Sequence, residues 1–199
     1  MNANNYKEAS GKIFYGVLGM SILSVLGGIL STVAAAATVA SIVNGGGGGS
    51  TWYLFVVPIL TVVCYVYYFL GLGDLYKEFD GTTAANIKKI RTAAILAIIG
   101  TLVSMIPVAG GIINAILQVI AAIMCLLAYG ELRVDNAFPG RDGMKTLYTA
   151  AILQIIAFVL CIIPLINIIG LIISIVAFIM IIVGWAKVKN APVSDTPAM

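Results

Sequence analysis

The sequence predicts an all-α integral membrane protein in which six transmembrane helices form three helical hairpins. Three observations support this prediction: a strongly apolar composition, six apolar runs of membrane-spanning length, and an internal repeat. The chain of 199 residues is 61% hydrophobic and 10% charged, with a mean hydropathy of +1.10. A soluble domain of this size could not bury so much apolar surface, so a bilayer must surround most of it.

The six apolar runs follow one another through short connections. We expect transmembrane helices at 13–43, 52–73, 87–106, 110–129, 146–163 and 167–186. Each run can cross a hydrocarbon core of roughly 30 Å as a helix that rises about 1.5 Å per residue. Strands are excluded, because backbone groups in lipid must find their hydrogen bonds within the segment.

The repeat is an apolar hairpin that occurs twice at an offset of 57 residues, as Lys88 and Lys145 show. A TAAIL pentad follows each of these lysines, and each hairpin turns at a proline, Pro107 or Pro164. The first hairpin resembles a diverged copy with 19 extra residues in its long first helix and glycine loop. We therefore predict a single membrane domain, 1–199, with parallel repeat-like hairpins at 12–73, 88–133 and 145–189.

Basic residues alternate between the connections. All eleven Lys and Arg lie in the N-terminal tail, the second and fourth connections and the C-terminal tail. By the positive-inside rule, both termini face the cytoplasm. The prediction is a multi-pass protein of the cytoplasmic (inner or plasma) membrane. Aromatic residues near the basic helix ends are expected in an interfacial belt: Tyr15, Tyr68, Tyr129, Tyr148 and Trp185.

The first apolar run is too long for a simple crossing. As one helix, 13–43 would measure about 46 Å, so it tilts, kinks at Gly27-Gly28 or projects from the outer surface. The loop 44–51 is glycine-rich and is predicted to be a flexible outer turn, and the tail 190–199 is predicted to be disordered.

Small residues four apart in the first helix form two rows that permit close helix approach. The candidate packing seam consists of Ser24, Gly27, Gly28, Ser31 and Thr32. It would join helices within one bundle or, alternatively, two protomers.

Four amide side chains in the apolar segments are the candidate functional residues. Buried amides in lipid are costly and require partners. Asn114 and Gln118 are one turn apart, Gln154 lies on the fifth segment and Asn167 opens the sixth. They would either line a polar path or form hydrogen bonds between helices.

Composition offers little for catalysis. The chain has no histidine, its three cysteines are isolated, and its eight acidic residues lie in loops or tails. We predict no catalytic, cofactor or metal site and no enzymatic activity. The preferred hypothesis is a structural or assembly protein that packs against itself or another membrane protein. The alternative is a channel or passive transporter for a small or lipid-like solute. Expected partners are membrane lipids and membrane proteins, and no nucleic acid.

Overall fold

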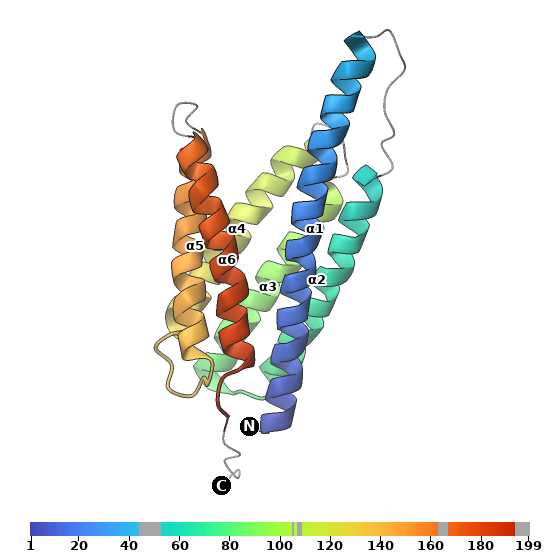
Figure 1. Ribbon diagram of the computed structural model, residues 1–199. Helices are drawn as coiled ribbons and strands as arrows, with labels where there is room; N and C mark the ends of the chain where they lie inside the picture. The colour runs from blue at the N-terminus through green and yellow to red at the C-terminus, as the bar shows by residue number, and fades with distance from the viewer. Residues whose placement is uncertain (44–52, 105, 107–108, 163–166, 194–199) are drawn as a thin grey trace.

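The computed structural model describes the whole chain except residues 44–52, 105, 107–108, 163–166 and 194–199. The described residues form α-helices and no strand (Figure 1). The helices are α1 (Ala3–Val43), α2 (Tyr53–Lys77), α3 (Gly81–Val103), α4 (Ala109–Leu132), α5 (Arg141–Ile162) and α6 (Asn167–Lys189). The predicted all-α fold of six helices is confirmed.

Five of the six helices are long and apolar enough to cross a membrane, as expected of a multi-pass membrane protein. Within the described residues, α3 does not meet that criterion. It begins at Gly81, so that Lys88, Lys89 and Arg91 lie inside the helix. The apolar part of α3 that remains, 92–103, is short, and the crossing predicted at 87–106 stays a prediction.

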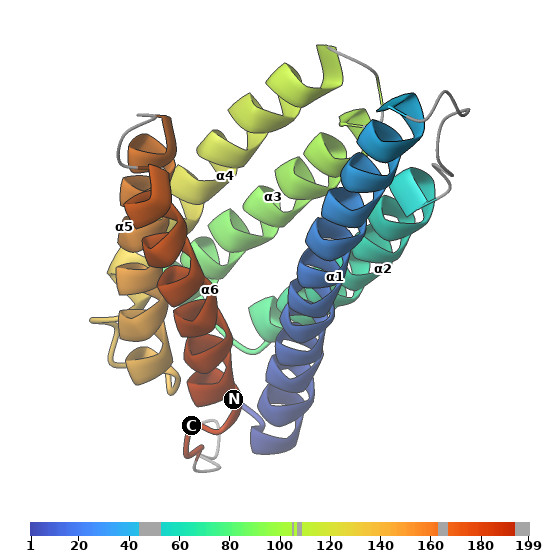
Figure 2. The ribbon, with the colours of Figure 1, turned by 45° about the horizontal axis from the view of Figure 1, so that its top comes forward.

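Each helix packs against its two neighbours in the sequence, and α6 closes the circle by packing against α1. The most extensive contacts join α1 with α2, α3 with α4, and α5 with α6. Figure 2 shows these three helix pairs leaning apart toward one end of the molecule. Helices that are not neighbours in this ring do not approach each other through their backbones within the described residues, although some of their long side chains meet at the axis. The fold is therefore a ring of three helix pairs around a central axis.

The ring is tightly packed only at the end that carries the basic residues. Leu72, Leu132, Phe138, Met144 and Val188 are all fully buried there. This is the end at which the N-terminus and the last residues of α6 lie in Figure 1. Toward the other end most large apolar side chains are exposed, because the helix pairs diverge.

Glycines allow the helices of a pair to approach closely. A Cβ on Gly71 of α2 would lie 2.8 Å from the backbone nitrogen of Ile13 in α1. A Cβ on Gly143 of α5 would lie 2.6 Å from the carbonyl oxygen of Gly184 in α6. At both positions any side chain would collide with backbone, so close packing requires glycine there.

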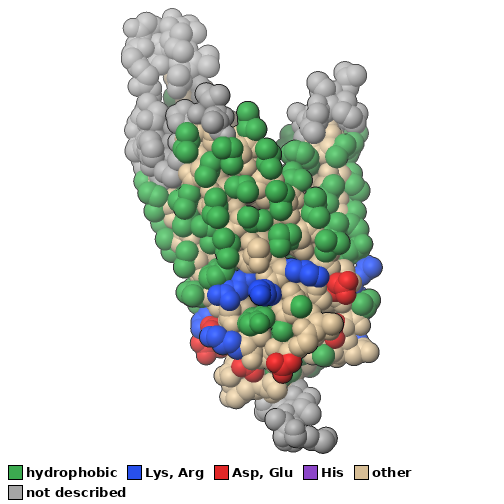
Figure 3. Space-filling model, turned by 180° about the vertical axis from the view of Figure 1, so that it is seen from behind, with side chains coloured by type: hydrophobic (Ala, Val, Ile, Leu, Met, Phe, Trp, Pro, Cys, Tyr) green, Lys and Arg blue, Asp and Glu red, His purple; other side chains and the backbone are tan. Residues whose placement is uncertain are grey.

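The outer surface is divided into an apolar zone and a charged belt. Figure 3 shows hydrophobic side chains over most of the visible face, with Lys, Arg, Asp and Glu gathered below them. Ile112 and Ile168, in α4 and α6, are 65% and 73% exposed. Such exposure is expected where lipid is the solvent.

Helix α1 is continuous and 41 residues long. It starts ten residues before the predicted 13–43, because Asn2 caps it: the Asn2 side-chain oxygen accepts a hydrogen bond from the backbone N–H of Asn4 at 2.9 Å. Its C-terminal end reaches beyond the other helices in Figure 1, which is the outcome expected if the long first run projects, one of the three alternatives.

Two further predictions fall partly or wholly outside the described residues. The glycine loop 44–51 is not described. Of the tail 190–199 the structure describes 190–193, where Ala191 is buried and Val193 packs against the core.

Candidate binding cavity

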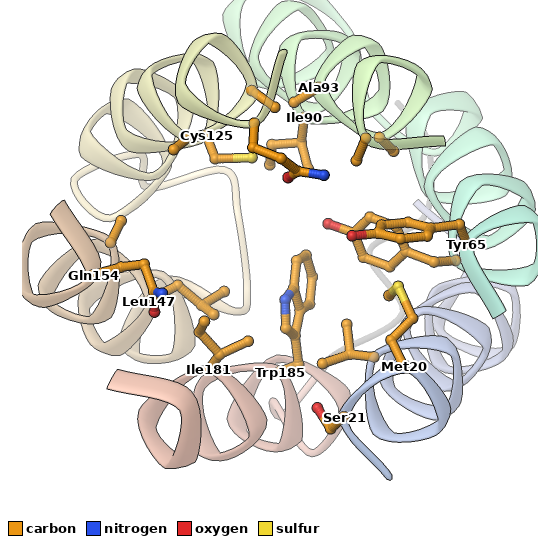
Figure 4. Close-up of a pocket in the computed structure, with 18 of the residues that line it drawn as sticks. Met20, Ser21, Tyr65, Ile90, Ala93, Cys125, Leu147, Gln154, Ile181 and Trp185 are labelled. Carbon is orange, nitrogen blue, oxygen red and sulfur yellow. The ribbon is translucent and has the colours of Figure 1, made fainter. Parts of the chain in front are cut away.

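A cavity of about 420 Å³ lies inside the helix ring, and all six helices contribute to its lining. In Figure 4 the view along the ring shows Trp185, Gln154 and Cys125 pointing into it from α6, α5 and α4. None of the described lining residues is charged. The cavity exists because the helix pairs diverge from a packed end, which leaves space where side chains from opposite helices do not meet.

Three aromatic side chains close the cavity toward the basic end. The rings of Tyr68 and Trp185 meet edge to face at a centroid distance of 5.7 Å, and those of Tyr129 and Trp185 at 6.3 Å. Trp185 is 1% exposed, and Tyr68 and Tyr129 are 7% exposed. The predicted interfacial belt is therefore wrong for these three residues. They lie near the basic helix ends as expected, but they face the ring axis instead of the membrane surface.

Tyr15 and Tyr148, the other two residues of the predicted belt, lie on the outside of the ring. Tyr15 is 54% exposed, and Tyr148 is half-buried beneath the side chain of Arg133.

A second aromatic cluster seals the basic end beyond the cavity floor. The Tyr6 ring lies 6.3 Å from both Phe79 and Phe138, and the Tyr6 hydroxyl donates a 3.0 Å hydrogen bond to the carbonyl of Val188. These side chains come from α1 and from the connections after α2 and α4. We call this cluster of Tyr6, Phe79 and Phe138 the plug. Sequence analysis missed it, because its members are far apart in the chain and follow no regular spacing.

Polar side chains lie mainly in the half of the cavity that is farther from the plug. Two of them, Thr61 and Thr101, donate their hydroxyls to carbonyls of their own helices, those of Val57 and Ala97. The polar lining residues are Ser21, Ser24, Thr61, Thr101, Gln118 and Gln154. The cavity thus has an aromatic, apolar floor and a polar upper wall.

Two of the four predicted amides, Gln118 and Gln154, line the cavity. Asn114 is directed at the neighbouring helix instead: a Cβ on Gly100 of α3 would lie 2.6 Å from its side-chain oxygen. That oxygen also accepts a 3.3 Å hydrogen bond from the Gln118 side chain. Asn114 therefore makes an interhelical contact and orients Gln118. The side chain of Asn167 lies outside the described residues.

Gln154 is the lining amide best placed to meet a ligand. It is exposed to the cavity, and no hydrogen bond joins it to another side chain or to the backbone among the described residues. Figure 4 shows its polar end directed toward the interior of the ring. An amide at this depth offers both a donor and an acceptor to an uncharged polar group.

The candidate packing seam on α1 divides between different surroundings. Ser24 lines the cavity, and Gly27 faces α2, where a Cβ would lie 3.0 Å from Val57. Gly28 has open space around it, and its carbonyl accepts hydrogen bonds from the hydroxyls of Ser31 and Thr32. Gly27 thus contributes to packing within the bundle, whereas Gly28, one turn after Ser24, has no described neighbour within reach of a Cβ.

The described thiols are free and serve no metal site within the described part of the chain. Cys64 packs beneath Gly19 of α1, and Cys125 lines the cavity. The side chain of Cys161 is not among those described.

No known protein family, curated protein or solved structure matches this chain.

Proposed function

We propose that the protein is a passive transporter that holds a small, uncharged or lipid-like solute in the cavity of the helix ring. The observation that carries the proposal is the cavity itself: six helices surround it, its floor is aromatic, and its polar wall holds Gln118 and Gln154. This favours the alternative hypothesis from the sequence over a purely structural role.

The absence of charge in the described lining favours an uncharged solute. An ion in this cavity would lose its hydration without gaining a counter-ion, which is costly in a low-dielectric site. A neutral solute loses less and can bond to the amides of Gln118 and Gln154. The floor formed by Trp185, Tyr68 and Tyr129 suits the apolar part of such a molecule.

The internal repeat supports a cavity built from equivalent positions. Several lining residues of α2 are followed, 57 positions later in the chain, by a lining residue of α4, and the same holds for α3 and α5. The pairs are Thr61 and Gln118, Tyr65 and Ala122, Tyr68 and Cys125, Ile90 and Leu147, Ala94 and Ala151, and Ala97 and Gln154. In this proposal the helix pairs are diverged parallel repeats, and the plugged basic end and both termini face the cytoplasm. The plug then corresponds to an inward-closed state.

Stopped-flow light scattering of proteoliposomes tests the proposal with glycerol and urea as uncharged probes. We expect wild-type protein to accelerate the entry of at least one of them over protein-free liposomes. Gln118→Leu and Gln154→Leu should slow that entry, because each removes an amide from the wall. Thr149→Leu changes an exposed residue of α5 outside the lining and is the control. Equal rates with and without protein would contradict the proposal.

Assembly is the second candidate function, and an exposed stretch of α1 beside α2 favours it. Nothing lies within 4 Å of a Cβ placed on Gly28, and the neighbouring side chains of Val25 and Ile29 are exposed. A surface of this kind permits close approach of another helix. The mass of the protein in mild detergent tests the idea: a dimer or larger assembly that dissociates in Gly28→Leu supports it. A monomer that is unchanged by the substitution would contradict it.

A further inference from the structure

A basic side chain stacks on an aromatic ring at each of the three places where neighbouring helix pairs meet. Between α2 and α3, the Arg91 guanidinium carbon lies 4.3 Å from the centre of the Phe69 ring. Between α4 and α5, Arg133 lies 3.8 Å from Tyr148. Between α6 and α1, the Lys189 ammonium nitrogen lies 4.4 Å from Tyr15. These seams are outside the cavity, because none of the three basic residues lines it.

A glycine lies against each of the two arginine stacks. A Cβ on Gly73 would lie 3.6 Å from the guanidinium carbon of Arg91, so the arginine passes directly over this glycine. A Cβ on Gly130 would lie 3.3 Å from the Tyr148 ring, on which Arg133 stacks. Gly73 and Gly130 are separated by the repeat offset of 57 residues. Both stacks therefore lie beside corresponding glycines, with the position of Arg91 taken by Tyr148 in the second seam.

The two arginines differ from the basic residues at the periphery of the same end. Within the described part of the chain, the ion pairs join Lys12 to Glu8 and Asp74, Lys77 to Asp74, and Lys145 to Asp142. Neither Arg91 nor Arg133 takes part in these pairs. The Nε of each is buried and has no hydrogen-bond partner among the described residues.

An aromatic stack holds a guanidinium in place but accepts none of its in-plane N–H groups. The Nε–H of each of these two half-buried side chains lacks an acceptor among the described residues, and a buried donor without an acceptor is unfavourable. The planar fork of arginine matches phosphate oxygens in two-point contacts. Basic side chains gather directly below the apolar zone in Figure 3, the level at which lipid headgroups meet a membrane protein.

We propose that Arg91 and Arg133 each bind the phosphate group of an anionic phospholipid at the seam between two helix pairs. The acyl chains of the lipid then lie along the exposed apolar surfaces of the helices at that seam. Lys189 lies at the third seam, but its ammonium already donates a 3.1 Å hydrogen bond to the Tyr15 hydroxyl. We therefore do not propose a lipid site at Lys189.

Native mass spectrometry of protein released from nanodiscs tests the proposal, with phosphatidylglycerol in a phosphatidylcholine background as the probe. We expect wild-type protein to retain two phosphatidylglycerol molecules, and Arg91→Gln and Arg133→Gln to lose one each. The expected loss of affinity at each site is about tenfold, or roughly 1.4 kcal/mol. Lys88→Gln removes an exposed charge three residues before Arg91 on the same helix and is the matched control.

Two further experiments distinguish a specific lipid site from a diffuse attraction between basic side chains and anionic lipid. Arg91→Lys and Arg133→Lys keep the positive charge but lose the planar guanidinium, and we expect them to weaken the retention of phosphatidylglycerol as well. These variants also provide a second test if a glutamine variant fails to fold. Inorganic phosphate added at millimolar concentration to the nanodiscs that contain phosphatidylglycerol should not displace this lipid; if it does, the sites hold free phosphate and the lipid proposal is overturned. Equal losses in Lys88→Gln and Arg91→Gln would also overturn it, since they would indicate diffuse charge attraction.

Discussion

The two halves of the helix ring contain the same kinds of apolar residue, but these residues are buried in a core in one half and exposed in the other. At the basic end Leu132, Phe138 and Val188 are 0% exposed and belong to one continuous core. At the other end Ile112 and Ile168 are exposed, because the helix pairs have separated.

The contrast places the tight packing at the end where the helix pairs converge. Stability is therefore concentrated beside the plug, whereas the space that can hold a solute lies beyond the aromatic floor. Substitutions of the same residue type in the two halves test this division directly.

The largest effect is expected from Phe138→Ala. Phe138 is completely buried between Tyr6 and Phe79, and removal of such a ring lowers the free energy of unfolding by about 3–5 kcal/mol. Phe158→Ala is the control in the diverging half, where Phe158 is 53% exposed and should contribute much less. Reversible unfolding in mixed detergent measures both, and equal losses would remove the distinction between the halves.

Gly143→Ala should have the next largest effect. The new methyl group would collide with the Gly184 carbonyl and the Val188 nitrogen, and overpacking of this kind costs about 1–3 kcal/mol. Gly28→Ala, where a Cβ meets nothing within 4 Å, should leave the unfolding free energy unchanged or raise it. The account fails here if Gly28→Ala is the more destabilising of the two in the same unfolding measurement.

Tyr6→Phe is expected to cost about 1 kcal/mol, because it removes a buried hydrogen bond to the Val188 carbonyl and keeps the ring. Tyr15→Phe is the matched substitution at an exposed tyrosine, whose hydroxyl accepts a hydrogen bond from Lys189. Thermal melting should show a lower midpoint for Tyr6→Phe alone. A larger shift for Tyr15→Phe would contradict the importance of the plug.

The smallest effect concerns Glu78 at the rim of the basic end. Hydrogen bonds from the backbone N–H of Asn2 at 2.9 Å and the side-chain amide of Asn5 at 2.8 Å lower the pKa of the Glu78 carboxyl below its usual value. The contribution of Glu78 to stability is therefore present above the ordinary glutamate pKa and is lost as the pH falls through the lowered value. Since the contact is near the surface, we expect less than about 1 kcal/mol.

Glu78→Gln should accordingly reduce the melting midpoint at pH 7 slightly and flatten its dependence on pH between roughly 5 and 3. Glu131→Gln removes an exposed carboxylate at the same end and is the control. An identical pH profile for Glu78→Gln and wild type would show that these hydrogen bonds add nothing to stability.

Much of the fold could be predicted because it depends on local patterns. Apolar runs and turn residues identify helices, so the six segments were found along the chain, with α1 extended by the Asn2 cap. The sequence could offer a polar path lined by Gln118 and Gln154 only as one of two alternatives, since their meeting in one cavity depends on the closure of α6 against α1.

Trp185 shows why the cavity floor was missed. An aromatic residue next to basic residues at a helix end is typical of a membrane interface, and the sequence contains nothing that tells the outward face from the inward one. The seam arginines were likewise explained by topology alone. Only the contacts with Phe69 and Tyr148 distinguish them from the surrounding lysines.

The central claim, that the ring binds an uncharged solute above the aromatic floor, is tested most directly by the fluorescence of Trp185. The chain has two tryptophans, so Trp52→Phe leaves Trp185 as the sole reporter. Octanamide should change its emission in a saturable manner, and Gln154→Leu should weaken that binding several-fold. Octanoate and octylammonium, of similar length but charged, should not saturate it. Emission that does not respond to octanamide, or that responds equally to all three probes, would contradict the claim.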